Sequence, residues 1–178
     1  MPSKAPKSSD AISLLTQDHE AVMQLFSAFR ALARSEEPAE VEKAALAEQI
    51  CMHLSVHAQV EEEIFYPAVR ESSDDHAVMD EAEVEHATAK DLVADILSMH
   101  TADALFDATV IVLGEYVDHH VKQEQREMFP KAKKAGIDLA GLGAEIAARK
   151  QALLVEYGGQ TARLRWEDED ADPVGSRV

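Results

Sequence analysis

The chain has 178 residues, 46% of them hydrophobic, which is enough for one domain with a sizeable core. Its formal net charge of −17 would repel a polyanion such as DNA and an anionic membrane surface. The single cysteine, Cys51, excludes an internal disulfide and fits a reducing compartment, and no apolar run is long enough to cross a bilayer. We therefore expect a cytoplasmic protein that binds neither nucleic acid nor membranes.

Few aromatic residues and only seven glycines, in a chain rich in Ala, Glu, Leu and Val, favour helix over sheet. Residues 1–9 resemble a flexible leader, after which Ser9 can cap a first helix running from about 10 to 33. Pro38 suits the first turn of a second helix, which Pro67 should bend or end.

A turn at 72–75 precedes a third helix that ends near residue 99. A fourth helix then runs from about 101 to Pro130, and Asp138 can cap a shorter fifth helix that Gly158 and Gly159 end. Long helices with short connections form up-down-up-down bundles. The predicted fold is therefore all-α, with a four-helix bundle over 10–135, a short C-terminal helix over 136–159 and an acidic, disordered tail over 160–178.

The chain repeats itself at an offset of 63 residues. His57, Glu61, Tyr66 and Pro67 fall on His120, Glu124, Phe129 and Pro130. His19 and His86 also correspond, because an acidic residue precedes each of them. The repeat predicts two helical hairpins, each with a lone histidine and a His-x-x-x-Glu pair, packed about a pseudo-two-fold axis so that both sets face the bundle centre.

Residues four apart on a helix share one face, so His57 and Glu61 can aim at a single point. A buried carboxylate must be compensated, and three compensations are possible. The first is a protonated histidine held by its own glutamate, which is common for one such pair but not for two in register. An acid–base catalytic pair is the second, and it needs a substrate cleft that the sequence does not indicate. The third is a cation.

Imidazole and carboxylate without thiolate suit iron, although zinc or manganese can occupy such a site. Two five- or six-coordinate metals need roughly ten to twelve donor positions. Four imidazoles and two bridging carboxylates would fill most of these and leave room for small ligands. The rival ferritin-like site uses Glu-x-x-His and is rich in carboxylates, so the His-x-x-x-Glu order argues against it.

These segments resemble the hemerythrin family, in its His-His-Glu cation-binding branch. The resemblance rests on four segments and covers about residues 10–133: Asp18-His19-Glu20, the run from His57 to Pro67, Glu85-His86, and the run from His120 to Pro130. It implies a non-haem site of two iron ions joined by an oxo or hydroxo bridge. The implied ligands are His19, His57, Glu61, His86, His120 and Glu124, with Glu61 and Glu124 as bridges.

The sequence departs from the oxygen-carrying members of that family at two places. Lys90 stands where those members have a further histidine, four residues after His86, and the chain closes with His-x-x-x-Glu rather than His-x-x-x-x-Asp. One imidazole fewer implies a more exposed iron, which favours peroxide turnover, sensing or storage over reversible oxygen carriage.

Residues beside the implied ligands are further candidates. His53 and Tyr116 each precede an implied ligand histidine by one helical turn. Each could hydrogen-bond to a ligand or bind the metal itself. The alternative is that each is simply a polar residue at the edge of the core. A water molecule is the other candidate for the metal-coordination position that the missing histidine would fill, where this chain has Lys90. We expect Tyr66 to plug the core at the bundle end and Glu62 to be solvated.

Family members bind dioxygen or nitric oxide, sense oxygen or iron, or act on peroxide. We accordingly predict a di-iron protein, a monomer or weak homodimer, that binds or reacts with O2, NO or H2O2. Three alternatives stay open: a catalase-like enzyme that decomposes peroxide, a redox, oxygen or iron sensor that reports to a protein partner through its fifth helix, and a metal-free helical adaptor.

Overall fold

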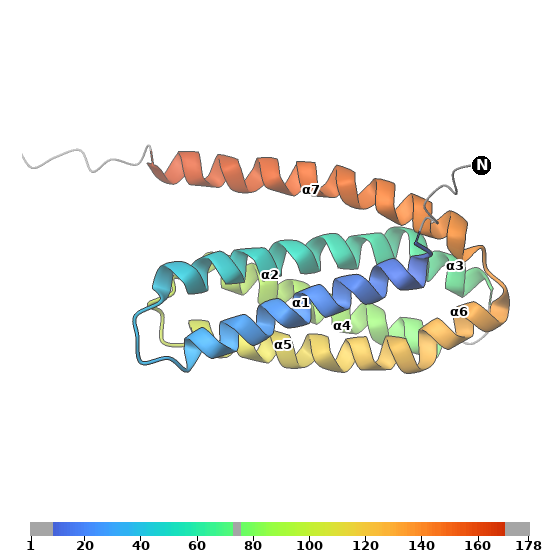
Figure 1. Ribbon diagram of the computed structural model, residues 1–178, viewed down its shortest axis with the longest axis horizontal. Helices are drawn as coiled ribbons and strands as arrows, with labels where there is room; N and C mark the ends of the chain where they lie inside the picture. Colours follow the sequence, from blue (N-terminus) through green and yellow to red (C-terminus); the bar gives the residue numbers. More distant parts are fainter. Residues whose placement is uncertain (1–8, 73–75, 170–178) are drawn as a thin grey trace, which may run out of the picture.

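In the computed structural model the described residues are 9–72 and 76–169, and beyond residue 158 only the backbone is described. The described chain is helical, which confirms the predicted all-α bundle (Figure 1). Its α-helices are α1 (Ala11–Ala33), α2 (Glu40–Val60), α3 (Tyr66–Glu71), α4 (Ala77–Ser98), α5 (Phe106–Gln123), α6 (Phe129–Ala135) and α7 (Leu139–Glu169). Two short π-helices, η1 (Glu61–Phe65) and η2 (Glu124–Met128), join α2 to α3 and α5 to α6.

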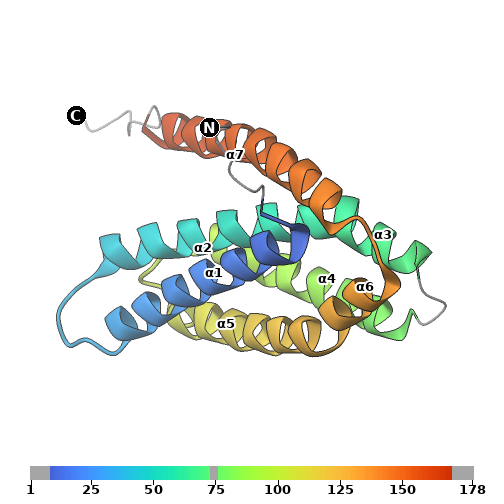
Figure 2. The same ribbon diagram turned by 45° about the vertical axis from the view of Figure 1, so that its right-hand side comes forward.

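The four long helices of the bundle form a ring of neighbours. α1 contacts α2 and α5, and α4 contacts the same two helices. Successive long helices run in opposite directions, and α7 returns along the outside of the α1–α2 hairpin (Figures 1 and 2). Within the part of the chain that the structure describes, no helix is both long and apolar enough to span a membrane.

Helix ends follow local sequence signals with small shifts. The carboxylate of Asp10, rather than Ser9, caps α1 by accepting the N–H of Ser13 at 2.8 Å. Asp138 accepts the N–H of Gly141 at 3.0 Å and caps α7 as predicted. Residues 1–8 of the predicted leader, 73–75 of the predicted turn and 170–178 of the predicted tail lie outside the described residues.

The core consists of two apolar clusters stacked along the bundle. The cluster nearer α3, α6 and α7 includes Leu15, Phe65 and Ile146, and the other includes Phe26 and Leu113. α1, α2 and α4 contribute to both clusters, while α5 contributes to the second and its continuation through η2 and α6 contributes to the first. A short polar layer is therefore enclosed between the clusters. That layer carries the predicted metal ligands.

The π-helix η1 begins at Glu61 and leads into Tyr66 and Pro67. The N–H of Tyr66 bonds to the carbonyl of Glu61, five residues earlier. A proline in a regular α-helix clashes with the carbonyl four residues back and cannot donate a hydrogen bond to it, but a wider π turn relieves this conflict. The helix therefore continues through Pro67 to Glu71, so the prediction that Pro67 could end it is wrong.

The second π-helix, η2, repeats the first one at the predicted offset. It begins at Glu124, and the N–H of Phe129, the residue before Pro130, bonds to the Glu124 carbonyl. In both π turns, residues five apart lie on one face, whereas a regular α-helix places residues three or four apart there.

The fifth helix is longer than predicted. α7 runs for 31 residues to Glu169, so the expected end at Gly158 and Gly159 is wrong, as is the expected tail over residues 160–169. Glycine in a helix interior costs only about 1 kcal/mol relative to alanine and does not by itself stop a helix. Gly136, by contrast, has a left-handed φ of 73° and ends α6.

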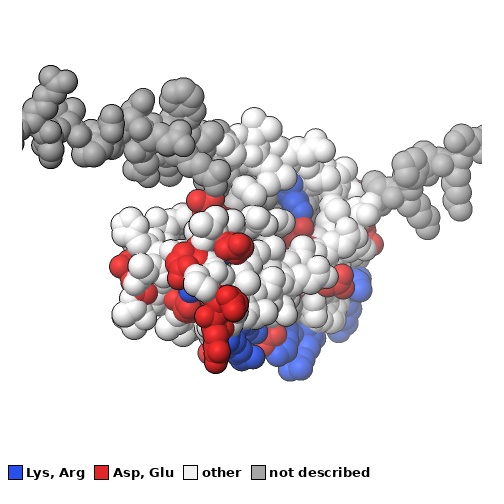
Figure 3. Space-filling view, turned by 60° about the vertical axis from the view of Figure 1, so that its left-hand side comes forward, with Lys and Arg blue, Asp and Glu red and all other residues white. Residues whose placement is uncertain are grey.

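Acidic and basic side chains occur on the same face of the molecule. Figure 3 shows acidic side chains gathered near the middle of one face and basic side chains along its lower edge. Arg70 pairs with Asp80 and Glu83, and Arg149 pairs with Glu63. Such surface pairs contribute little to stability, so the two apolar clusters hold the helices together.

The close crossing of α7 over the start of α1 requires a glycine. A Cβ placed on Gly143 would lie 2.9 Å from the backbone nitrogen of Ala11 and still closer to the carbonyl oxygen of Ser9. Because backbone atoms cannot swing aside, we expect Gly143→Ala to lower the free energy of unfolding by about 1–3 kcal/mol, measured by urea denaturation. A Cβ on Gly158 meets nothing within 4 Å, so Gly158→Ala is the control. Equal stability of the two variants would contradict this prediction.

Candidate metal centre

The six predicted ligands converge at the middle of the bundle. His19 comes from α1, His57 from α2 and His86 from α4, while His120 lies on α5 and the two glutamates open η1 and η2. All six side chains are buried, and Glu61 is fully inaccessible to solvent. Six ionisable groups thus share one enclosed layer between the apolar clusters.

The ligand atoms form two overlapping groups. His19, His57, Glu61 and Glu124 place atoms within 4.8 Å of one another, and so do Glu61, His86 and His120. The Nε2 atoms of His19 and His57 are 3.0 Å apart, and those of His86 and His120 are 3.1 Å apart. Glu61 belongs to both groups, so its carboxylate lies between two histidine pairs.

Three further carboxylates support the ligand histidines from outside. His86 Nδ1 donates to Glu62 at 2.9 Å, and His120 Nδ1 donates to Glu85 at 2.8 Å. The third carboxylate, Asp18, lies 3.6 Å from His57 Nδ1. None of these roles was predicted from the sequence, and the prediction that Glu62 is solvated is wrong, because its carboxylate binds His86 and Lys90. The sequence did contain one indication of the roles of Asp18 and Glu85, because each directly precedes a predicted ligand histidine on its own helix.

These outer carboxylates determine which ring nitrogens face the centre. A carboxylate only accepts, so Nδ1 of His86 and of His120 donates to it, and Nε2 of each ring faces the centre. These two Nε2 atoms lie 3.1 Å apart, close enough to bind one shared cation. Glu61 Oε1 and Glu124 Oε2 are also buried without a hydrogen-bond partner. The arrangement therefore fits a cation and is poorly satisfied without one.

In the protein alone, protons supply part of that positive charge. Burial lowers the pKa of His57, but attraction to the carboxylates of Glu61 and Asp18 outweighs burial and raises the pKa to about 10. Burial raises the pKa of Glu61, yet His57 and its neighbours hold that pKa well below its ordinary value. A metal ion must therefore displace the proton on His57 to bind there.

Tyr66 is a site residue that the sequence analysis missed. Its ring packs in the core as predicted, but its hydroxyl lies 3.1 Å from His86 Nε2 and donates to Glu124 Oε1 at 3.0 Å. The π turn causes this placement, because Tyr66 is five residues from Glu61 and its hydroxyl lies 3.4 Å from the Glu61 carboxylate. Burial, together with the nearby glutamates, raises the pKa of Tyr66 well above its ordinary value.

Tyr66, rather than His53 or Tyr116, places a side-chain oxygen within hydrogen-bond distance of the predicted ligands. The ammonium group of Lys90 contacts the outer carboxylate of Glu62, and its side chain is 55% exposed. Across the described residues, no hydrogen bond joins His53 or Tyr116 to a predicted ligand; His53 is half-buried, and Tyr116 is 45% exposed.

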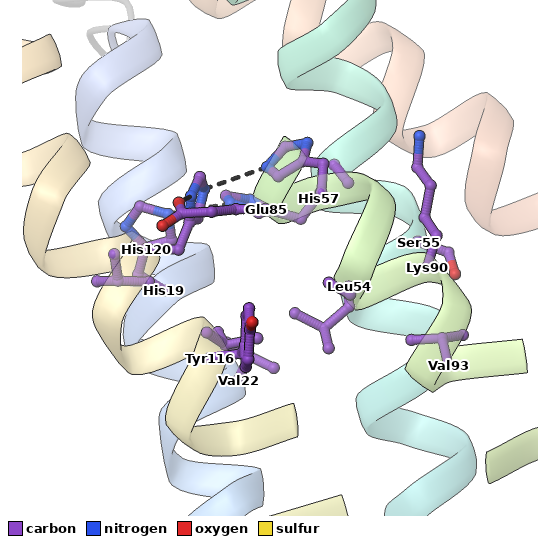
Figure 4. A pocket seen from close by; sticks show the side chains of 15 residues that line it. His19, Val22, Leu54, Ser55, His57, Glu85, Lys90, Val93, Tyr116 and His120 are labelled. Atoms are coloured by element: carbon purple, nitrogen blue, oxygen red, sulfur yellow. Dashed lines mark hydrogen bonds and ion pairs between the residues drawn. The ribbon is translucent and has the colours of Figure 1, made fainter. Parts of the chain in front are cut away.

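A small apolar cavity of about 40 Å³ opens onto the histidines. Figure 4 shows His19, His57 and His120 at one end of it, with Val22 and Leu54 at the other. One water needs roughly 10–15 Å³ of such space, so the cavity admits a molecule of only a few heavy atoms.

The convergence of the six predicted ligands agrees with the protein family that the sequence matches. The family model of the hemerythrin HHE cation binding domain matches residues 10–132. The chain belongs to the hemerythrin HHE cation-binding domain family. The match contains all six predicted ligands and Tyr66, and it ends within α6, so α7 lies beyond it.

Solved structures add support for the fold of this HHE domain. A hemerythrin HHE cation binding domain-containing protein from Mycobacterium kansasii is 22% identical, with a TM-score of 0.70, over 88% of this chain and 93% of that one. At that identity the likeness shows the fold alone. Among curated proteins, none matches the chain.

The proton on His57 predicts how the metal-free HHE domain responds to pH. Because the folded state raises this pKa from 6.5 to about 10, the associated stability is complete below about pH 6.5 and is lost as the pH rises toward 10. We expect urea denaturation of chelator-treated protein to give a lower unfolding free energy at about pH 9 than at about pH 6. His57→Gln should flatten this dependence, and an unchanged slope in that variant would refute the assignment.

Proposed function

We propose that this protein is a non-haem di-iron protein that binds or reacts with a small oxidant such as O2, NO or H2O2. The observation that carries the proposal is the buried layer of inward-facing imidazole nitrogens and of carboxylate oxygens without a hydrogen-bond partner. Glu61 Oε1 and Glu124 Oε2 each lie 3.2 Å from an imidazole nitrogen, of His57 and of His19 respectively, yet neither oxygen has a hydrogen-bond partner. Two metal ions would engage the same atoms directly.

The donors divide between two metal positions. His19 and His57 would hold one ion, and His86 and His120 would hold the other, with Glu61 and Glu124 shared between them. The Tyr66 hydroxyl is within reach of the second ion, because it lies beside His86 and His120. Imidazole, carboxylate and phenol oxygen together suit iron, for which tyrosine is a known protein ligand.

The protein's own residues restrict what reaches the iron. The apolar walls of the cavity favour uncharged molecules, and its volume of about 40 Å³ excludes anything larger than a few heavy atoms. Bound iron would supply the redox chemistry, while the chain fixes the ligands and keeps bulk water away. O2, NO and H2O2 all satisfy these limits of size and charge.

Iron content tests the proposal directly. We expect protein loaded with Fe(II) under anaerobic conditions to retain two irons per chain, measured by elemental analysis after desalting, and to gain a near-ultraviolet absorption band on exposure to O2 or H2O2. Glu124→Gln should reduce the iron content to one or none, because it removes a shared charged donor. Glu127→Gln is a matched control, since Glu127 is exposed on the same π-helix. Wild-type protein that retains no iron, or one tightly held zinc, would refute the di-iron proposal.

Tyr66→Phe separates a ligand role for the tyrosine from a packing role. The substitution keeps the ring in the core and removes only the hydroxyl. If the phenol oxygen binds the second iron, the oxidised wild-type protein has a visible phenolate-to-iron absorption band that the variant lacks, while Glu61 and Glu124 still hold two irons. Spectra that are identical in the two proteins would show that the Tyr66 hydroxyl only donates a hydrogen bond to Glu124.

Peroxide decomposition is the enzymatic alternative, and oxygen release distinguishes it from binding. An enzyme evolves oxygen steadily over many turnovers of added H2O2, whereas a binding protein changes its spectrum once and stops. The reducing compartment inferred from the single cysteine fits either function, because Cys51 is buried as a free thiol.

A further inference from the structure

The inner face of α7 carries a lysine where the helical spacing calls for a core residue. Ile146 and Leu153 of this face are fully buried in the core. Lys150 lies between them in the same helical stripe, and only 24% of its side chain is exposed. A partly buried lysine needs a partner, and its partner is Asp18 of α1.

Asp18 is also the outer carboxylate of a predicted ligand. One oxygen of Asp18 binds the ammonium group of Lys150, and the other faces Nδ1 of His57 at 3.6 Å. That distance is too long for a hydrogen bond, and both facing atoms are buried without any other hydrogen-bond partner. Lys150 thus holds the carboxylate that faces Nδ1 of His57.

In the pseudo-symmetric half of the site, no described residue of α7 pairs with the corresponding carboxylate. Glu85 corresponds to Asp18 and accepts from His120 Nδ1 at 2.8 Å, and its other oxygen lies 3.5 Å from the exposed His119. Glutamate is one methylene longer than aspartate, so Glu85 reaches its histidine unaided. The shorter Asp18 depends on how α1 and α7 are placed.

We propose that Lys150 is a positioning residue that couples the docking of α7 to metal binding at the His57 side of the site. The inference rests on the proposed metal site. A metal ion on Nε2 of His57 makes the Nδ1 proton more acidic and strengthens its attraction to Asp18. Since Lys150 fixes the same carboxylate, metal binding and α7 docking favour each other, and the coupling is reciprocal.

Arg149 provides a matched control on the same helix. It also makes an ion pair from α7 to the bundle, with Glu63 of η1 at 2.6 Å, but Glu63 contacts none of the ligand histidines. Arg149→Ala therefore removes one cation and one bridge from α7 without disturbing an outer carboxylate. Lys150→Met removes the corresponding bridge to Asp18 and keeps the apolar stem that packs in the interface.

The experiment measures Fe(II) affinity anaerobically against a competing chelator, and amide hydrogen exchange of α7 with and without Fe(II). Removing support from a ligand histidine typically costs about 10–100-fold in metal affinity, and we expect Lys150→Met to cost about 10-fold. Lys150→Arg should restore the affinity, and Arg149→Ala should leave it within about twofold. Fe(II) should slow exchange in residues 139–158 of wild type and Arg149→Ala, but not of Lys150→Met.

A double-mutant cycle that combines Lys150→Met with Asp18→Asn shows whether Lys150 acts through the Asp18 carboxylate. The double variant should bind Fe(II) no more weakly than Asp18→Asn alone. The coupling is overturned if Lys150→Met binds Fe(II) as tightly as wild type does. It is also overturned if Arg149→Ala weakens Fe(II) binding as much as Lys150→Met does. Wild-type protein that binds no Fe(II) would overturn the proposed function as well, so the two failures are distinguishable. Lys150→Gln, with circular dichroism as the check on folding, replaces Lys150→Met if that variant does not fold.

Discussion

The structure depends on the cost of burying two carboxylates in the middle of an apolar bundle. Glu61 and Glu124 lie between two hydrophobic clusters, where an uncompensated charge would cost several kcal/mol. Four imidazoles surround these carboxylates, one from each long helix of the bundle. The polar layer therefore fixes how the helices align along the bundle, because sliding any one of them would separate a histidine from its carboxylate.

Much of this arrangement was predictable because it depends on spacing. The four-residue interval from His57 to Glu61, repeated at His120 and Glu124, places each pair on one face whatever the detailed helix geometry. The repeat then predicts two hairpins and a shared centre. The family match over residues 10–132 confirms the resemblance that these segments indicated.

What could not be predicted depends on departures from regular helix geometry. Tyr66 is five residues after Glu61, an interval that points away from the ligand face of an α-helix, so only the π turn brings its hydroxyl into the centre. The prolines were visible in the sequence, but a proline can end, kink or widen a helix, and sequence alone does not say which. Gly158 and Gly159 were misleading for a similar reason, since they carry no φ requirement of their own inside α7.

The two halves of the centre are related by the repeat but are not equivalent. Tyr66 brings a hydroxyl to the site, whereas its counterpart Phe129 stacks its ring on His19 at a centroid distance of 6.0 Å. Asp18 and Glu85 differ in length, and Lys150 of α7 binds the first of them. The two similar hairpins thus supply matching histidines and glutamates, and single-residue differences give each half its own polar groups and support. Two metal ions held in this frame would have unequal environments even though their histidine ligands match.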